Sequence, residues 1–438
     1  MGLDAQLIGV VDEGLGNSAY LLDLGDGRAL AVDAPRDLRA MRGAADKHGL
    51  TIAYAADTHL HADFLSGAVQ LATDDGAQVL ASAAGMRQFD HRGLRDGDEI
   101  DLGGLTMQAL ATPGHTDEHL SFVIRDGSTP AGVFSGGSLI VGSAARTDLM
   151  GKQRTIELAH AQFASLQRLA ALPAATALWP THGEGSFCSA PPGSARTSTI
   201  GAEKAGNALL AAPDAETFTR LLTADLGSYP AYFAWLAEAN RRGPAVVSGQ
   251  LALTPLTADE VHAHLVSGAV VVDVRPISAV AHGHLPGAVS IALRPQFATW
   301  LGWTIAPDAP LIIVRHPDQD PADILWPAYN IGYTNFAGEL HGGIDAWLAS
   351  GRPLVTTPLI TVDHASPRVL DVRQDNEYDE GHRPGTIHIE LGDLAARVDE
   401  VGAGPVTVMC AHGQRAMTAA TMLQRNGIAD VSVIGNGG

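Results

Sequence analysis

Residues 58–63 read Thr-His-Leu-His-Ala-Asp and place three residues of metal-ligand type, His59, His61 and Asp63, within five positions. An apolar run over residues 51–56 precedes them, which predicts a strand that ends in a ligand-bearing loop. Neutral imidazoles and a carboxylate together suit a borderline or hard divalent metal. The alternative is a polar loop whose histidines only form hydrogen bonds.

Two more histidines stand in the same kind of position. His115 lies in a Thr-Pro-Gly-His-Thr turn, and His182 follows the apolar run 177–179 through Pro-Thr. Histidines at the ends of several strands can assemble a metal site at the edge of a sheet, so both join the predicted site. Cys188 follows His182 closely. We expect it either to accept or position a substrate sulfur or to be a small buried residue.

A second chemical pattern begins at Cys410, after the buried-strand pattern of residues 406–409. The sequence Cys-Ala-His-Gly-Gln-Arg leads into a helix rich in small and apolar residues. Backbone N–H groups and the helix N-terminus favour a thiolate in such a loop, and Arg415 adds donors for a bound anion. The pattern predicts a nucleophile or a persulfide carrier. A buried structural cysteine and a phosphatase are the alternatives, although a phosphatase loop is usually wider.

Composition restricts the class of protein. The chain has 438 residues, 46% hydrophobic and 17% charged, which is ordinary for two to four globular domains. Its formal charge of −20 argues against a nucleic-acid partner. No stretch reads as a membrane span or a secretory signal. With only two cysteines, a reducing compartment is expected, and we predict a cytoplasmic protein.

The first half alternates strand and helix patterns. Strand pairs joined by Asp-Gly turns are predicted at residues 17–22 with 29–32 and 120–124 with 132–134. Helices are predicted at 37–48, at 156–171 and within 197–242. Sheets covered by helical layers are the expected architecture.

From about residue 250 the chain repeats itself. Asp273-Val274-Arg275 precedes Gly-His-Leu-Pro-Gly, and Asp371-Val372-Arg373 precedes Gly-His-Arg-Pro-Gly with the same spacing, 98 residues later. Gly342-Gly343 matches Gly437-Gly438 at an offset of 95. A duplication of this period predicts two similar α/β domains.

These repeated motifs, the Cys-x-x-Gly-x-Arg loop and the terminal Gly-Gly resemble the rhodanese family over roughly residues 250–438. The resemblance implies sulfane-sulfur transfer with Cys410 as the persulfide-bearing nucleophile. The implied cradle is Ala411, His412, Gly413, Gln414 and Arg415. In the first copy Arg315 aligns with Cys410 and Asp320 with Arg415, so we expect that copy to be structural or interface-forming.

Residues 5–245 resemble the metallo-β-lactamase superfamily, in its glyoxalase II and persulfide dioxygenase branch. The motifs are 12–18, Val32-Asp33, 113–116 and 146–149. The resemblance implies an αββα sandwich that holds metal. Two positions depart from the family: Phe64 replaces a ligand histidine, and Gly137 replaces the metal-bridging aspartate.

These departures imply one divalent metal held by His59, His61 and His115, with Asp63 and His182 nearby as outer or weak second-site groups. Fe(II) is favoured over Zn(II), and loss of metal binding is the third alternative. Candidate substitutes for the missing carboxylate are Asp117, Glu118 and Asp148.

We therefore predict an N-terminal αββα metallo-β-lactamase sandwich over residues 1–248. A rhodanese-like domain without the cysteine follows over 249–356, and a rhodanese domain with Cys410 over 357–438. The expected function is persulfide and sulfide metabolism: a dioxygenase-like metal domain coupled to a sulfurtransferase. A metal-dependent thioester hydrolase with an attached sulfurtransferase, or a sulfur-carrier or sensing protein, are the alternatives. The expected partners are a low-molecular-weight thiol persulfide, sulfite or thiosulfate, within a homo-oligomer.

Overall fold

The computed structural model describes residues 6–188, 193, 195–224 and 226–435. The chain forms two compact units, Met1–Ser248 with Tyr329–Gly332, and Gly249–Ala328 with Tyr333–Gly438. Within the described part of the chain, no helix has the length and apolar character needed to cross a membrane.

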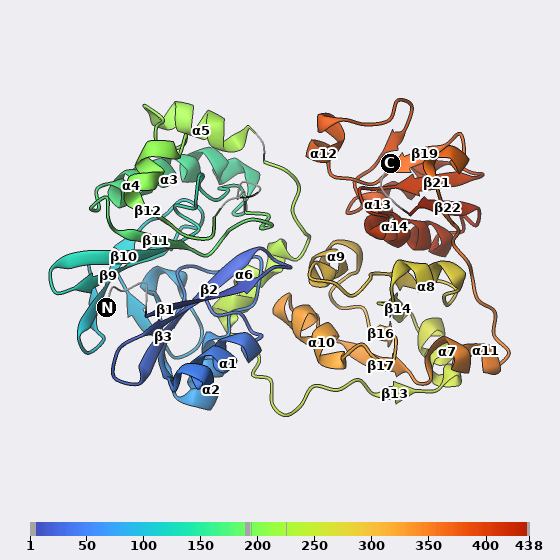
Figure 1. Cartoon of the computed structure of the whole chain (residues 1–438), viewed down its shortest axis with the longest axis horizontal. Helices are drawn as coiled ribbons and strands as arrows, with labels where there is room; N and C mark the ends of the chain where they lie inside the picture. The colour runs from blue at the N-terminus through green and yellow to red at the C-terminus, as the bar shows by residue number, and fades with distance from the viewer. Residues whose placement is uncertain (1–5, 189–192, 194, 225, 436–438) are drawn as a thin grey trace. The chain divides into compact units, whose positions relative to one another are not determined.

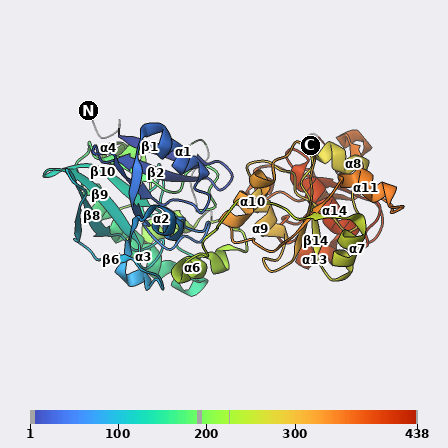
Figure 2. The same cartoon turned by 90° about the horizontal axis from the view of Figure 1, so that it is seen from below.

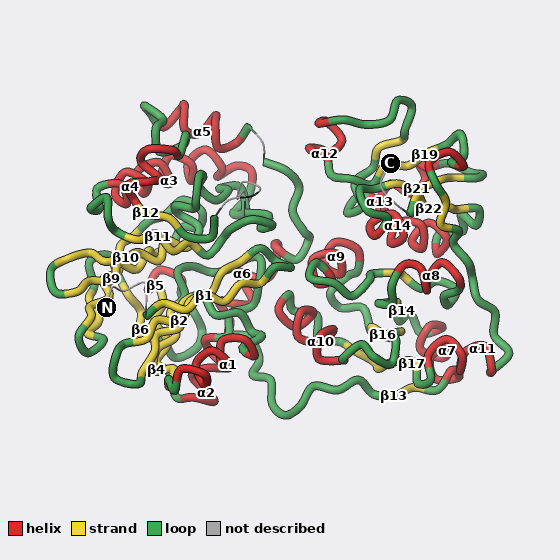
Figure 3. The backbone as a smooth tube through the Cα atoms, in the orientation of Figure 1, coloured by secondary structure: helices red, strands yellow, loops and turns green. Residues whose placement is uncertain are grey.

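The N-terminal unit contains two six-stranded sheets, drawn in yellow in Figure 3. The first runs in the order β1 (Leu7–Asp12), β2 (Asn17–Asp23), β3 (Arg28–Val32), β4 (Thr51–Ala56), β5 (Gln78–Ser82) and β6 (Arg92–Leu94). The second runs β12 (Ser198–Thr199), β11 (Ala177–Pro180), β10 (Thr129–Gly136), β9 (Leu120–Asp126), β8 (Leu105–Ala111) and β7 (Glu99–Asp101).

Eight helical segments lie in the described residues of this unit. They are α1 (Arg39–His48), α2 (Ala68–Asp75), α3 (Thr155–Ala170), α4 (Ile200–Gly206), α5 (Ala215–Thr223) and α6 (Phe233–Arg242), with the short 3₁₀ turns Ala83–Gly85 and Lys152–Arg154.

One face of each sheet supplies the central core, because alternate strand residues point to the same side. Tyr20, Leu80, Phe122 and Trp179 from the two sheets are buried together there. Helices α1 and α2 cover the opposite face of the first sheet (Figure 1), and Met41 of α1 is buried there together with residues of α2. On the second sheet, α3 and α5 form the equivalent layer. The unit is therefore the predicted αββα sandwich.

Both predicted Asp-Gly hairpins are confirmed. Tyr20 pairs with Val32 between antiparallel β2 and β3, and Val123 pairs with Val133 between β9 and β10. The predicted helices 37–48 and 156–171 correspond to α1 and α3 within two residues. The segment 197–242 contains three helices, which Pro213 and Pro230 help to separate.

The C-terminal unit contains two five-stranded parallel sheets with the same connectivity. The first runs β13 (Pro255–Leu256), β17 (Phe336–Leu340), β16 (Leu311–Val314), β14 (Val270–Asp273) and β15 (Val289–Ser290). The second runs β18 (Leu359–Ile360), β22 (Val431–Ile434), β21 (Val406–Met409), β19 (Val369–Asp371) and β20 (Ile387–His388). Helices α7 (Ala258–Val266), α8 (Ile277–His282), α9 (Phe297–Thr304), α10 (Pro321–Asn330) and α11 (Gly343–Ala349) belong to the first copy. The second has α12 (Asp375–Glu380), α13 (Leu394–Val401), α14 (Gln414–Arg425) and the 3₁₀ turn Val362–His364.

The duplication extends to individual side chains. Arg275 donates to the Asp273 carboxylate and to the carbonyl of Gly283. Arg373 donates in the same way to Asp371 and to the carbonyl of Gly381. The repeated Asp-x-Arg motif is thus a fork that fixes the end of a strand to the loop after the next helix. The Gly437-Gly438 match lies outside the described residues.

Helix α14 contacts β15 of the first copy, and Figure 1 shows it on the side of its own sheet that faces α8 and α9. Figure 2 shows the same unit from below. The hydroxyl of Thr418 donates to the carbonyl of Ser290 in β15, and the backbone N–H of Ser290 donates to the hydroxyl of Thr421. Both threonines are buried, so the first copy holds the helix that follows Cys410.

Candidate functional site

Three histidines meet at the ends of strands from both sheets of the N-terminal unit. His59 follows β4, His115 follows β8, and His182 follows β11. One ligand atom from each lies within 4.8 Å of the others, and all three residues are buried. The ring centroids of His59 and His115 are 4.9 Å apart, and those of His115 and His182 are 5.1 Å apart.

Each ring is fixed through its Nδ1 atom. The Nδ1 atoms of His59, His115 and His182 contact Thr58 Oγ1 at 2.8 Å, the carbonyl of Arg146 at 2.7 Å and Asn17 Oδ1 at 3.0 Å, respectively. The Nε2 atoms of His59 and His182 are buried without a hydrogen-bond partner. Fixing one nitrogen orients the other, which is how proteins preset imidazole ligands.

The electrostatics favour neutral rings with free lone pairs. Burial, with the neighbouring histidines, lowers the pKa of His59 well below its usual range. Burial lowers the pKa of His115 and of His182 to about 3. Neutral imidazoles bind divalent metals, so the unpartnered buried nitrogens and the donor set fit a metal ion.

His61 differs from the expectation, because its Nε2 lies 3.1 Å from Asp33 Oδ1. Its ring stacks on Phe64 with centroids 4.1 Å apart, while its Nδ1 has no hydrogen-bond partner. The ligand atoms that lie close to His61 belong to Asp33 and Asp57. His59 and His115 are therefore grouped with His182, where the sequence suggested His61.

Gly137 stands where the family has a metal-bridging aspartate, and its missing side chain leaves room for the His115 ring. A Cβ on Gly137 would lie 2.3 Å from Cδ2 of His115. The His115 ring thus occupies the space that a side chain at position 137 needs.

The three carboxylates named as candidate substitutes for the missing aspartate each bind another group. Asp117 pairs with Arg154, and Asp148 pairs with Arg146. Glu118 accepts the backbone N–H of Leu60.

His119 belongs to this cluster, although no sequence pattern predicted a role for it. Its ring stacks on that of His59 at a centroid distance of 5.0 Å. Both of its nitrogens are used, one toward Thr112 Oγ1 and one accepting the backbone N–H of Gly137. His119 therefore packs and orients the site without a free ligand atom, and no spacing in the sequence distinguishes it.

Asp63 and Cys188 also lie close to His182. Ligand atoms of Asp63, His182 and Cys188 also lie within 4.8 Å of one another. Asp63 Oδ2 accepts from Asn17, whereas its Oδ1 is buried without a partner. Burial raises the pKa of the Asp63 carboxyl, and burial raises that of the Cys188 thiol well above its usual range.

In the C-terminal unit, Cys410 stands at the end of β21 and its side chain is buried. Its Sγ accepts the backbone N–H of Ala416, in the first turn of α14, at 3.3 Å. Gly413 has a φ of +76°, and a Cβ there would lie 2.8 Å from the carbonyl oxygen of Gly435. This position therefore requires glycine for the chain to turn from the loop into the helix.

The other cradle residues differ in exposure. His412 is exposed, and Ala411 is half-buried. Gln414 is the first residue of α14, and its Oε1 is buried without a hydrogen-bond partner.

Cationic and aromatic side chains surround the sulfur. Arg415 donates twice to the Glu377 carboxylate, at 2.5 and 2.7 Å, and lies over the ring of Trp300 at 5.6 Å. Burial opposes the charge of Arg415, but Glu377 and Cys410 raise its pKa. Burial and the charge of Arg415 lower the pKa of Arg294. Arg294 and Trp300 come from the first copy, and motif reading did not find them because they match no rhodanese motif.

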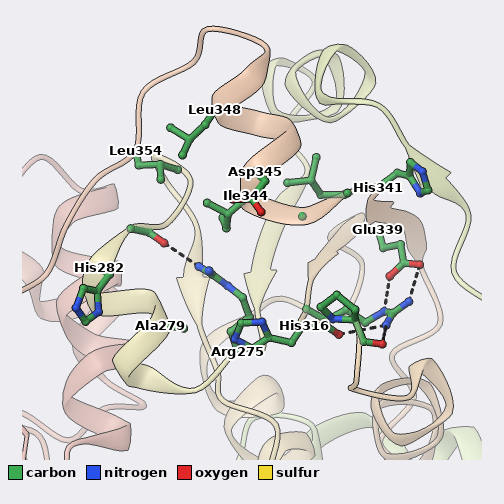
Figure 4. Close-up of a pocket in the computed structure, with 16 residues that line it drawn as sticks. Arg275, Ala279, His282, His316, Glu339, His341, Ile344, Asp345, Leu348 and Leu354 are labelled. Atoms are coloured by element: carbon green, nitrogen blue, oxygen red, sulfur yellow. Dashed lines mark hydrogen bonds and ion pairs between the residues drawn. The ribbon is translucent and has the colours of Figure 1, made fainter.

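The first copy has a pocket of about 500 Å³ beside Arg315, the residue aligned with Cys410. The guanidinium Nε of Arg315 lies 2.5 Å from the carboxylate of Glu339, which Figure 4 labels in the pocket wall. His316 and Arg275 are also part of the wall. The pocket lining contains no cysteine.

Comparisons with known proteins give a family match for the C-terminal part of the chain and curated relatives that match about a third of the chain. Residues 257–350 and 361–438 match the family model of the Rhodanese-like domain. The hydroxyacylglutathione hydrolase of Methylococcus capsulatus is 34% identical over 170 residues, which is 38% of this chain and 62% of that protein. The mitochondrial persulfide dioxygenase ETHE1 of Homo sapiens is 32% identical over 151 residues, 34% of this chain and 54% of the relative. The chain thus spans less than two thirds of the length of these relatives.

A solved structure matches more of the chain. The metallo-β-lactamase from Staphylococcus aureus subsp. aureus COL superposes with a TM-score of 0.67 and 28% identity. The superposition covers 76% of this chain and 98% of that one. The chain is therefore a metallo-β-lactamase-fold protein, homologous to glyoxalase II and persulfide dioxygenase, that carries two rhodanese-like domains.

Proposed function

We propose that this protein transfers sulfane sulfur through Cys410. The observation that supports this most directly is the Ala416 N–H donated to Cys410 Sγ at the start of α14. A helix N-terminus and backbone donors stabilise the thiolate, which is the reactive form of cysteine.

The transfer needs no external oxidant. The Cys410 thiolate attacks the outer sulfur of thiosulfate or of a thiol persulfide, and the donor S–S bond breaks. Sulfite or a thiolate leaves with the electron pair, and Cys410 carries the new S–S bond. A nucleophilic acceptor then attacks the outer sulfur and restores the Cys410 thiolate.

Two arginines have separate roles in this proposal. Arg415 is fixed by Glu377, so its remaining donors are oriented toward the loop. Arg294 has lost part of its hydration through burial, which strengthens its attraction for an anionic donor such as thiosulfate.

The test is sulfur transfer from thiosulfate to cyanide, together with mass measurement of the protein after exposure to the donor. Cys410→Ser should reduce transfer to the background rate and prevent the added sulfur. Cys188→Ser is the matched control and should retain transfer. Full transfer by the Cys410→Ser protein would disprove the assignment.

A second activity is proposed for the N-terminal unit, the metal-dependent oxidation of a thiol persulfide. The supporting observation is the set of three buried imidazoles with oriented Nε2 atoms. Iron held by His59, His115 and His182 would supply redox chemistry, and zinc would supply a Lewis acid for thioester hydrolysis instead. The overall oxidation consumes one dioxygen and one water per persulfide and yields the thiol, sulfite and two protons.

The protein's own residues prepare this site by excluding water and keeping the imidazoles neutral. Sulfite is an acceptor for the persulfide on Cys410, so the two proposed activities share a compound. This common sulfur chemistry is our reason for favouring oxidation over thioester hydrolysis.

Oxygen uptake with glutathione persulfide distinguishes these alternatives. The iron-loaded protein should consume oxygen, and His115→Ala should lose this activity, while the exposed control His160→Ala should keep it. Hydrolysis of a glutathione thioester by the zinc-loaded protein, without oxygen uptake, would favour the hydrolase. Neither activity, with sulfur transfer intact, would favour a sulfur carrier whose metal domain is not catalytic.

A further inference from the structure

The first rhodanese-like copy has a pocket of about 500 Å³, although residues 249–356 contain no cysteine. Arg275, Arg315 and His341 line this pocket, and each follows the end of a parallel strand, β14, β16 or β17, within two residues. Ligands of α/β sheets usually bind outside the carboxyl ends of the strands. Small-molecule sites typically have volumes of about 300–1,000 Å³. The pocket therefore has the place and the size of a binding site without a sulfur nucleophile.

The two sides of the pocket differ in polarity. Figure 4 shows Leu348 and Leu354 on one side and Glu339 and His341 on the other. Leu348 is 48% exposed, so its side chain is free to pack against a bound molecule. An apolar side opposite a polar side suits a ligand that has a hydrocarbon stem and polar ends.

The charges in the pocket wall restrict the ligand further. Arg315 is paired with Glu339, so these two charges compensate each other. Arg275 binds the Asp273 carboxylate through its Nε and Nη2 atoms, and its Nη1 has no hydrogen-bond partner among the described residues. Asp345 lines the same pocket and forms no ion pair with a described residue. The pocket thus offers a donor for a carboxylate and a carboxylate for an ammonium group.

Helix α8 connects this pocket to the loop that holds Cys410. Ala279 and His282 of α8 line the pocket. Ile277, the first residue of the same helix, lies against the loop, because a Cβ on Gly413 would be 3.2 Å from Ile277 Cδ1. A ligand in the pocket therefore contacts the helix that packs against the Cys410 loop.

We propose that this pocket is an effector site for a zwitterionic ligand, an amino acid or a small peptide, whose binding keeps the Cys410 loop closed. The ligand carboxylate binds Arg275, its ammonium group binds Asp345, and its stem packs against Leu348 and Leu354. An opening of the loop that displaces α8 also disrupts the pocket, so a bound ligand opposes it. The regulatory part of this inference rests on the proposed sulfur transfer, whereas binding in the pocket does not.

Titration calorimetry of the full-length protein tests the site with two probes, S-methylglutathione and methionine. Neither probe has a thiol, so neither can exchange sulfur with Cys410. Binding of methionine would identify a free amino acid as the ligand, and binding of S-methylglutathione alone would identify a small peptide. Asp345→Asn should weaken binding about tenfold, and N-acetylation of the probe should do the same because it removes the ammonium group. Asp399→Asn, an exposed control on α13, should bind normally.

Alkylation of Cys410 by iodoacetamide, followed by mass measurement, tests the effect on the loop. The Cys410 side chain is only 1% exposed, so the reagent reaches the sulfur when the loop opens. A saturating probe should slow alkylation about fivefold, and Asp345→Asn should remove this protection. Alkylation does not require sulfur transfer, so failure of this inference is distinct from failure of the transfer proposal.

Three results would overturn the inference. The first is that neither probe binds, and the second is that binding is the same in the wild type and in Asp345→Asn, which would place it elsewhere in the chain. The third is binding that leaves the alkylation rate of Cys410 unchanged.

Discussion

His115 and Gly137 are in direct contact in the candidate metal centre. The His115 ring lies where a residue-137 side chain would be, and Gly137 in turn donates its N–H to His119. A side chain at position 137 and the present position of this imidazole therefore exclude each other unless the ring moves.

The first prediction concerns this pair. Gly137→Ala places a Cβ 2.3 Å from His115 Cδ2, so the ring must move. Overpacking of this kind costs about 1–3 kcal/mol, and the change should also weaken metal binding. Urea unfolding and metal titration measure both effects. Gly9→Ala is the control, because nothing lies within 4 Å of its Cβ position; equal stability of the two variants would contradict the prediction.

The sequence predicts which residues come close to the candidate metal site. It does not predict which of their atoms remain without a hydrogen-bond partner. The strand ends place His59, His115 and His182 together, since each follows an apolar run or a turn. The choice between His61 and His182 depends on hydrogen bonds from Asp33 and Asn17, which are distant in sequence. Such contacts form only when the chain folds, so spacing alone does not reveal them.

Helix α14 is the element on which the proposed sulfur transfer depends. Its first turn donates to Cys410, and its middle is held by Ser290 of the other copy. The helix therefore links the position of the sulfur to the packing between the two copies.

Thr421→Val tests this link. The change leaves the buried N–H of Ser290 without its acceptor, which costs about 1–3 kcal/mol. Stability should fall in a urea titration, and sulfur transfer should slow because the helix loses an anchor. Thr73→Val is the control, since the Thr73 hydroxyl is exposed and bonds only within α2. A Thr421→Val protein as stable as this control would show that the bond contributes nothing.

The hairpins and the longer helices could be predicted from the sequence, whereas the shortest strands could not. Asp-Gly turns between apolar runs identify the hairpins, and helical periodicity identifies α1 and α3. Strands β6, β7 and β12 have two or three residues, too few to show a period. The contribution of α9 to the Cys410 site was also missed, because it depends on packing between the copies.

On the scale of the whole chain, the two proposed chemistries use separate sets of residues. All described groups around Cys410 belong to the C-terminal unit, and the cluster of His59, His115 and His182 belongs to the N-terminal unit. The internal repeat predicts the paired α/β sheets. Homo-oligomer formation and a cytoplasmic location stay predictions.

Removing the metal should therefore affect only one unit. A ligand present at about 100 times its dissociation constant stabilises the folded state by about 2.7 kcal/mol. Chelation should lower the unfolding temperature of the N-terminal unit in calorimetry, while thiosulfate-to-cyanide transfer stays unchanged. Readdition of zinc is the control and should restore the transition. A parallel fall in sulfur transfer would show that the two chemistries depend on each other.

The ion pair between Arg315 and Glu339 limits the number of sulfur atoms that the C-terminal unit can carry in the proposed transfer. Cys410 is the only cysteine in residues 249–438, and the equivalent position in the first copy holds a charged side chain that already has a partner. Sulfur therefore cannot pass from a cysteine of one copy to a cysteine of the other, because only the second copy has a cysteine. In the proposed transfer, this unit therefore carries one labile sulfur at a time, and that sulfur leaves directly to an acceptor from outside the unit.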